Sequence, residues 1–203
     1  MARYTGPKVK ISRRFGTPIF GPSKVLERRN TPPGAHGNRR FRKKSSEYSE
    51  ALCEKQKLRY QYGLMEKQFR RLFEEAARRR GVTGVILLQL LETRLDNVLF
   101  RLGYGHTRPA SRQFVGHGHV LVNGRRCDIP SYQCKPGDKI TIRDNARSQQ
   151  LGMRLLDQSQ SRPVPEWVVI DRDKQAGSVA RVPTREEIDP IVNEQLVVEL
   201  YSR

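Results

Sequence analysis

RLDNVLFRLGYGHTRPASRQFVGHGHVLVNGRRCDIPSYQCKPGDKITI, residues 94–142, contains two kinds of periodicity in succession. Its first part continues a stripe of apolar residues at helical spacing, which predicts one helix over residues 83–102. After a short loop, Thr107 is a candidate N-cap for a helix that ends near Val115, with Pro109 tolerated in the first turn. The stretch therefore begins as a pair of helices.

Strand patterns dominate the second part. Residues 120–122 are apolar and include two β-branched valines, and Asn123-Gly124 is a strong signal for a two-residue hairpin. A Pro-Gly-Asp turn at 136–138 precedes a strand over 139–143. We therefore expect short helices packed on a small, largely antiparallel sheet.

The next segment adds less certain elements. A strand over 167–171 is expected to join the same sheet, whereas residues 144–165 have no clear pattern. Thr184 and Glu187 have the spacing of a capping box. A final helix is expected beyond them, with a buried face of Ile191, Leu196, Val197 and Leu200.

Helical patterns also precede the central stretch, over residues 47–62 and 65–80. The predicted fold class is therefore α+β. A helical domain would be built from residues 46–90 and 180–203, near both ends of the chain, and a small α/β module would span residues 91–179.

Residues 1–45 differ in composition from the rest of the chain. They contain thirteen Lys or Arg and one acidic residue, Glu27, for a local net charge of +12, and several Gly and Pro residues. Such a segment buries too little apolar surface to fold alone. It is interpreted as a basic, extended arm that becomes ordered on a polyanion, although a merely solubilising tail has the same composition.

The whole chain of 203 residues has a formal net charge of +18 and a pI near 10.5. A positive field of this size attracts polyanions such as nucleic acids or anionic membranes. No apolar run is long enough to span a bilayer, and the first residues have no secretory signal pattern. Three cysteines without C-x-x-C spacing favour a reducing compartment and packing roles.

The central stretch offers a basic surface for RNA. Arg94 and Arg101 are seven residues apart on the predicted helix, and Arg108 and Arg112 are four apart on the next one, so each pair would share a face. Arginine suits phosphate because its planar fork donates two parallel hydrogen bonds. The alternative is a solvated face, but the density of positive charge beside glycine turns favours RNA.

Catalytic and metal-binding patterns are absent from the sequence. His117-Gly118-His119 has no third ligand at a recognised spacing, so packing or polar contact is favoured over a metal site. Asp96 and Asp128 have no evident acid or base partner, and there is no phosphate-binding loop or nucleophile elbow. No cofactor, metal or small-molecule substrate is expected.

The central stretch resembles the small RNA-binding fold named after the fourth protein of the small ribosomal subunit. The resemblance to that ribosomal protein family, in its bacterial or organellar form, extends to MARYTGPKVKISRRFG at the start, PPGAHGNRRFRKKSSEYSEALCEKQKLRYQYGLMEKQFRRLF, and NEQLVVELYSR at the end. It covers the chain except residues 144–190. The resemblance implies a non-catalytic, ribosomal protein of the bacterial cytosol or of an organelle.

The same resemblance implies binding to the small-subunit (16S) ribosomal RNA at a multi-helix junction of its 5′ domain, nucleation of subunit assembly, and an influence on decoding accuracy with protein five. It implies contacts with small-subunit proteins three and five near the point where messenger RNA enters. Some family members hold zinc through N-terminal cysteines, but this sequence has none before Cys53. The residues expected to bind RNA are Arg3, Lys8, Arg13, Arg14, Arg39, Arg40, Arg42, Lys43, Lys44, Lys55, Arg59, Arg94, Arg101, Thr107, Arg108, Arg112, Gln113, His117, His119, Asn123 and Arg125.

Two other functions fit parts of the sequence. An RNA-modifying enzyme could use the module for targeting, but it would need a further domain with a catalytic constellation. A generic basic protein could bind any polyanion, including membrane surfaces. It would bind scrambled RNA equally well and lose all binding without residues 1–45.

Overall fold

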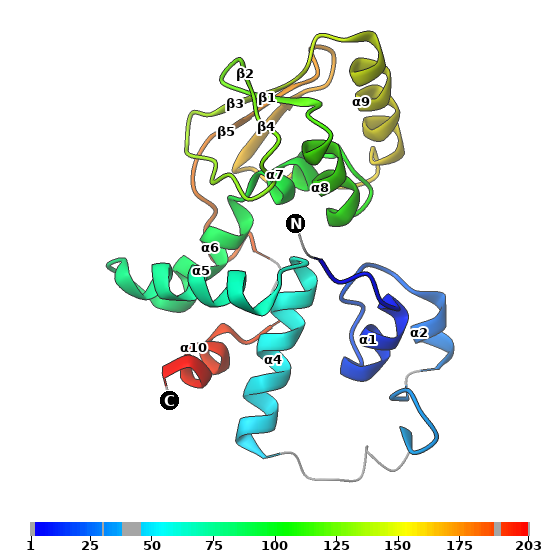
Figure 1. Cartoon of the computed structure of the whole chain (residues 1–203), viewed down its shortest axis with the longest axis vertical. Helices are drawn as coiled ribbons and strands as arrows, with labels where there is room; N and C mark the ends of the chain where they lie inside the picture. The colour runs from blue at the N-terminus through cyan, green and yellow to red at the C-terminus, as the bar shows by residue number, and fades with distance from the viewer. Residues whose placement is uncertain (1–2, 30, 38–45, 189–191, 203) are drawn as a thin grey trace. The chain divides into compact units, whose positions relative to one another are not determined.

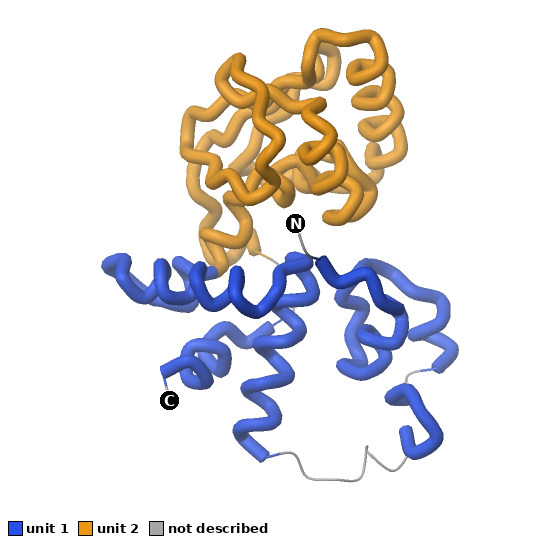
Figure 2. The backbone as a smooth tube through the Cα atoms, viewed as in Figure 1, with its two compact units in different colours: residues 1–87, 189–203 blue, residues 88–188 orange. Residues whose placement is uncertain are grey.

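The computed structural model describes residues 3–29, 31–37, 46–188 and 192–202. The chain divides into two compact units, one formed by residues 1–87 and 189–203 and the other by residues 88–188 (Figure 2). The first unit therefore joins the two ends of the chain. Helix α6 (Thr83–Glu92) begins in the first unit and ends in the second.

A five-stranded antiparallel sheet organises the second unit, with strand order β2-β1-β3-β5-β4 (Figure 1). The strands are β1 (Val120–Val122), β2 (Arg125–Arg126), β3 (Lys139–Ile142), β4 (Val168–Asp171) and β5 (Ala176–Val179). Helices α7 (Leu95–Leu102), α8 (Arg108–Gly116) and α9 (Ala146–Gln158) contribute to the same apolar core as the sheet. The predicted α+β class is confirmed.

The predicted hairpin is present at Asn123-Gly124. Both residues have positive φ, 51° and 78°, which is the conformation that a two-residue hairpin matching the twist of its strands requires. Leu121 pairs with Arg126 and Val122 with Arg125 across this turn. The strand expected at 167–171 also joins the sheet, as β4 beside β5.

The single helix predicted over residues 83–102 is wrong, because α6 and α7 are separate helices. Arg94 lies between them in an extended conformation, with φ −67° and ψ 138°. The loop that follows β2 hydrogen-bonds to this break: Leu95 N donates to Tyr132 O at 2.8 Å and Cys134 N to Thr93 O at 2.8 Å. These contacts with a distant loop replace helical hydrogen bonds, and Arg94 and Arg101 consequently do not share a helix face.

Two elements of the second unit had no counterpart in the sequence pattern. The unassigned residues 144–165 contain α9, whose N-cap Asn145 accepts a hydrogen bond from Arg147 N at 3.2 Å. Strand β5 has the sequence AGSV, which lacks the bulky side chains typical of strands. It forms because β3 and β4 pair with it on both sides.

The first unit is helical. The helices predicted over 47–62 and 65–80 are confirmed as α4 (Glu47–Gln61) and α5 (Glu66–Arg78). The predicted C-terminal helix is α10 (Glu194–Ser202), which packs on α4 and buries Val197. Ile191, expected on its buried face, lies outside the described residues.

The capping-box contact near the C-terminus forms without opening an α-helix. Glu187 accepts hydrogen bonds from the backbone N–H of Thr184 at 2.8 Å and from its hydroxyl at 3.0 Å, but residues 184–188 form turns. The same carboxylate accepts two hydrogen bonds from Arg181, at 2.7 and 2.6 Å. The motif therefore closes a turn.

The extended conformation expected throughout the basic N-terminal segment is wrong for two parts of it. Residues Lys8–Phe15 form α1 and Lys24–Arg28 form α2. Ile11, Ile19 and Leu26 are buried there, so a few apolar side chains fold the segment despite its charge. In the described part of the chain, no helix combines the length and hydropathy needed to cross a membrane.

Candidate nucleic-acid interface

The helix α8 begins as its sequence predicts. Thr107 is its N-cap and accepts a hydrogen bond from Ala110 N through its hydroxyl, at 3.4 Å, and Pro109 lies in the first turn. The threonine hydroxyl is thus used by the helix itself. Gln113 and His117, toward the other end of α8, have exposed side chains.

Arg94 and Arg112 meet at one carboxylate, that of Asp96. Arg94 donates to Asp96 through Nε at 3.2 Å and through Nη2 at 3.0 Å, and Arg112 Nη1 donates to Oδ2 at 3.0 Å. The Arg94 side chain is only 4% exposed. A guanidinium this buried holds the start of α7 rather than facing solvent.

Arg101 and Arg108 lie around a second carboxylate, that of Glu92, which is completely buried. Arg101 donates to it through Nε at 2.9 Å and through Nη2 at 2.8 Å. Arg108 Nη2 lies 3.9 Å from the same carboxylate, and its Nε donates to Asn97 Oδ1 at 2.8 Å. The Arg101 and Arg108 side chains are 13% and 17% exposed, so only an edge of each meets solvent.

Phe100 provides a flat surface for two of these cations. The guanidinium of Arg108 lies 4.6 Å from its ring centroid and that of Arg162 lies 4.1 Å from it. Arg162 also donates to the carbonyls of Phe100, Gly105 and His106, at 3.1, 3.1 and 3.0 Å. Burial, with Arg108 and Arg101 nearby, lowers the pKa of Arg162. Sequence reasoning missed this residue.

Asn123 and Arg125 lie at the hairpin and are both exposed, but the Asn123 amide is engaged within the protein. Asn123 donates through Nδ2 to Asp138 Oδ1 at 2.8 Å and accepts from Lys139 N at 2.9 Å. Its amide therefore ties the hairpin to the turn before β3. Arg125 is exposed.

The two histidines differ in environment. His119 stacks on Phe114 at 5.0 Å between ring centroids, and its Nδ1 lies 2.9 Å from Ser148 Oγ. Burial, with the nearby His117 and Arg143, lowers the pKa of His119. The stacking and the contact with Ser148 give His119 a packing role. Within the described ranges, no three His, Cys, Asp or Glu side chains are grouped as metal ligands.

Three further arginines extend the basic surface beside these histidines. The sequence places Arg126 next to Arg125 after the hairpin turn, whereas Arg143 and Arg147 were not predicted. The Arg126 guanidinium lies against Gly118, between the two histidines. Arg143 N donates to His119 O at 2.8 Å, and Arg147 begins α9 close to it in sequence. All three side chains are exposed. The arginine run of β2 was the only signal available in the sequence. Arg143 comes beside His119 through the pairing of β1 with β3, and Arg147 through the contact of its neighbour Ser148 with His119.

The described candidate residues of the first unit lie on α1, on α4 and, for Arg3, just before α1. Arg3, Lys8 and Arg14 are exposed, and Arg13 Nε donates to Thr31 O at 3.1 Å. Lys55 is 8% exposed and pairs with Glu66 at 2.7 Å, while the guanidinium of Arg59 lies 4.5 Å from the Tyr60 ring centroid. Lys55 thus serves packing within the unit. Five further candidates lie outside the described residues: Arg39, Arg40, Arg42, Lys43 and Lys44.

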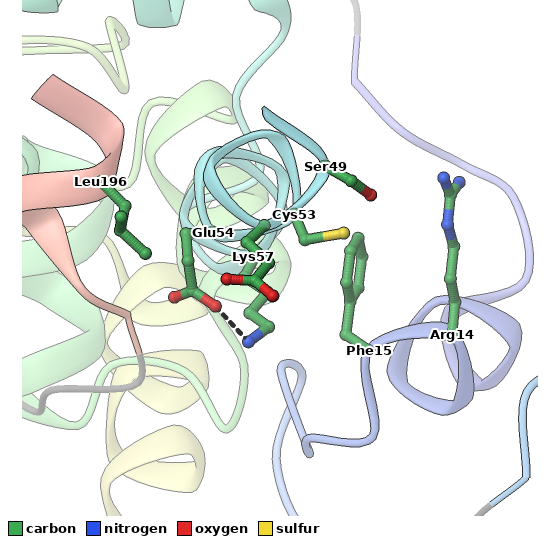
Figure 3. Close-up of a pocket in the computed structure, with 8 residues that line it drawn as sticks. Arg14, Phe15, Ser49, Cys53, Glu54, Lys57 and Leu196 are labelled. Atoms are coloured by element: carbon green, nitrogen blue, oxygen red, sulfur yellow. Dashed lines mark hydrogen bonds and ion pairs between the residues drawn. The ribbon is translucent and has the colours of Figure 1, made fainter. Parts of the chain in front are cut away.

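A pocket of ≈ 340 Å³ lies in the first unit (Figure 3). Glu54 in its wall is held by Lys57 Nζ at 2.5 Å and by the backbone N–H of Asn193 at 3.1 Å. This acid therefore holds α4 to the segment before α10 and is poorly suited to act as a base. The pocket is lined by Arg14, Phe15, Ser49, Glu50, Cys53, Glu54, Lys57 and Leu196.

Comparison with known proteins matches most of the chain. Residues 3–92 match the family described as Ribosomal protein S4/S9 N-terminal domain, and residues 93–140 match the S4 domain. The protein called Small ribosomal subunit protein uS4 from Akkermansia muciniphila is 61% identical over 203 residues, with both chains covered completely. Proteins of the same name from Opitutus terrae and Christiangramia forsetii are 53% and 50% identical, again over both full lengths. The chain therefore belongs to the ribosomal protein S4 family.

Proposed function

We propose that the protein is a structural, non-catalytic component of the small ribosomal subunit that binds ribosomal RNA and resides in the ribosome. The observation that carries this proposal is the full-length identity to proteins named for that subunit. The net charge of +18 and the arginines gathered on α7, α8 and β2 supply the chemistry that RNA phosphates require.

In more detail, we propose that the protein binds the 5′ domain of 16S RNA at a multi-helix junction. It would bind early enough to nucleate assembly of the subunit body. We further propose contacts with small-subunit proteins three and five near the entering messenger RNA, and a contribution to decoding accuracy with protein five. These proposals rest on the family resemblance. The residues offered for RNA contact are those predicted from the sequence, with Arg126, Arg143 and Arg147 added and without Lys55, Arg94, His119 and Asn123, whose side chains are engaged within the protein.

The proposed mechanism has two stages. Exposed cations such as Arg125 and Lys8 attract RNA over long range, releasing counterions from its phosphates. The arginines held around Glu92 and Asp96 then dock on RNA of matching shape, because folded RNA is recognised mainly through its backbone and shape. A rigid protein docked in this way fixes the relative orientation of RNA helices.

The test is binding of the full chain to a 5′-domain fragment of small-subunit RNA, compared with a scrambled RNA of equal length across a salt series. If about eight phosphates are neutralised, log affinity falls with log salt at a slope of roughly −6 to −7. We expect a preference of about a hundredfold for the native fragment that persists as salt rises. Equal binding to both RNAs at every salt concentration would contradict the proposal and favour the generic polyanion binder.

A pair of variants sharpens this test, because both remove one exposed arginine of the second unit. Arg125→Gln removes a proposed contact and should reduce the salt slope by about 0.7 to 0.9. Arg172→Gln removes an exposed arginine from the turn between β4 and β5, where no contact is proposed, and should leave the slope unchanged. If both variants reduced the salt slope equally, RNA binding would depend only on the net charge of the protein.

The RNA-modifying enzyme is not favoured. The relatives that match this chain over its full length are named as ribosomal proteins rather than as enzymes. Incubation of RNA with the protein and the usual cofactors should yield no modified nucleotide by mass spectrometry.

A further inference from the structure

Two carboxylates lie beneath the arginines of the proposed RNA surface. Glu92 is the last residue of α6 and is 0% exposed, and Asp96, in the first turn of α7, is 6% exposed. Between them they contact four guanidiniums, those of Arg94, Arg101, Arg108 and Arg112. Two negative charges are thus shared among four positive ones at the junction of α6, α7 and α8.

The contacts fix the direction of each guanidinium as well as its position. Both oxygens of Glu92 accept from Arg101, which is the bidentate geometry that orients the guanidinium plane. Asn97 extends the network, since its Nδ2 donates to Glu92 Oε2 at 2.6 Å and its Oδ1 accepts from Arg108 Nε at 2.8 Å. Arg108 is fixed on a second side by the ring of Phe100.

Asp96 performs the same role for the next helix. Its Oδ2 accepts from Nη2 of Arg94, at the start of α7, and from Nη1 of Arg112, on α8, each at 3.0 Å. Helices α7 and α8 pack directly on each other, so Arg112 is held at the seam between them (Figure 1). The arginines of both helices are thereby ordered before any RNA arrives.

Buried acids are a poor device for attracting RNA. Each carboxylate must be removed from water, which its partners offset only with good geometry, and each lowers the positive potential of the surface. A surface that needed charge alone would be stronger without them. Their benefit is geometric, because arginine has many rotamers and an arginine already fixed loses less freedom when it binds a phosphate.

We infer that Glu92 and Asp96 are positioning residues, which hold Arg101, Arg108 and Arg112 in the arrangement that distinguishes folded ribosomal RNA from other polyanions. The inference rests on the proposed function. It predicts that removing either negative charge weakens recognition of the native RNA, although the protein becomes more positive.

The primary test is Glu92→Gln, compared with Glu199→Gln as a control of identical chemistry on the exposed side of α10. Both substitutions raise the net charge by one. We expect Glu92→Gln to reduce the preference for the 5′-domain fragment over scrambled RNA by roughly tenfold or more, because at least two arginines lose their fixed rotamers. Binding of scrambled RNA should stay the same or strengthen, and Glu199→Gln should keep the full preference.

A second measurement separates positioning from a general loss of structure. In the free protein, the Nε–Hε groups of Arg101 and Arg108 should show the restricted motion of the backbone in nitrogen-15 relaxation, because each donates a hydrogen bond. Glu92→Gln should mobilise them while the amide spectrum of the sheet is retained. If Glu92→Gln fails to fold, Asp96→Asn tests the same inference at Arg112, with the exposed Asp128→Asn as its control.

The possible results test the proposed function and the positioning role separately. A wild-type protein without preference for the native fragment would overturn the proposed function, and this inference with it. The positioning role alone would be overturned by a different result. In that case the wild-type protein would prefer the native fragment, and the folded Glu92→Gln and Asp96→Asn variants would bind that fragment as tightly as their controls. The positioning role would be supported if the variants lost the preference for the native fragment and their arginine side chains became mobile.

Discussion

At the scale of single residues, Asn123 shows how a side chain suited to RNA can be used by the fold instead. Its φ of 51° places it in the left-handed region, where asparagine is tolerated better than most residues. Its amide is engaged by Asp138 and by the backbone of Lys139. A type of residue that commonly contacts nucleic acid is here part of the turn.

Substitutions at Asn123 should separate the contribution of its side-chain hydrogen bonds from that of its positive φ. Asn123→Gly keeps the backbone conformation but loses both side-chain hydrogen bonds, which should cost about 1–2 kcal/mol. Asn123→Ala loses the same bonds and adds the strain of positive φ, for a further loss of about 1 kcal/mol. Urea unfolding followed by the fluorescence of Trp167 measures this, because the chain's single tryptophan is fully buried in the second unit. Equal losses in the two variants would show that the backbone conformation contributes nothing.

At the scale of elements, contacts between segments override local patterns. The apolar stripe over residues 83–102 is continuous, yet the backbone leaves the helix at Arg94 because the loop at 132–134 supplies other hydrogen-bond partners. Strand β5 is likewise defined by what packs against it. Gly177 lies so close to α7 that a Cβ there would be 2.7 Å from Leu102 Cδ1 and 2.9 Å from Cδ2.

Gly177→Ala should therefore overpack the contact between β5 and α7. Leu102 is 1% exposed and has no room to move, so we expect a loss of about 1–3 kcal/mol. Leu102→Ala alone should cost about 2–5 kcal/mol through the cavity that it leaves. The double variant should lose less than the sum, because the new methyl group occupies part of that cavity. Strict additivity in urea unfolding of the four proteins would mean that the two residues do not compete for space.

At the scale of the whole molecule, the first unit is assembled from both ends of the chain. Glu66 on α5 is the meeting point: its Oε1 accepts from Lys55 Nζ of α4 at 2.7 Å and from the Tyr201 hydroxyl of α10 at 2.7 Å. The Tyr201 ring also stacks on Phe73, with 4.6 Å between ring centroids. One carboxylate thus joins the consecutive helices α4 and α5 to α10, at the other end of the chain.

Glu66 should give the first unit an acid-dependent stability. Burial raises the pKa of its carboxyl, but the hydrogen bonds from Lys55 and Tyr201 and the charges of Lys55 and Arg59 outweigh burial, and the pKa is lowered from 4.5. A lowered pKa means that the contribution is complete above that ordinary value and is lost as pH falls through the lowered one. Allowing for solvent screening of a half-exposed group, the contribution is about 0.5–1 kcal/mol.

Glu66→Gln should accordingly lower the melting temperature of the helical signal in circular dichroism at pH 7, and the difference from wild type should shrink below about pH 4. Glu74→Gln on the same helix, where the pair with Arg70 is exposed, serves as the control and should change little at either pH. A difference that is independent of pH would exclude the ion pair as its source.

The sequence by itself determined the features that depend on neighbouring residues: the helices α4, α5 and α8, the Asn123-Gly124 hairpin, the α+β class, and a polyanionic partner. Periodicity, capping and turn chemistry act within a few residues, so they can be read along the chain. Only the tertiary structure decided where α6 ends, that AGSV forms a strand, and that α1 and α2 fold within a basic segment. It also decided which arginines pair with Glu92 and Asp96, because ion pairs and buried contacts depend on which distant segments meet.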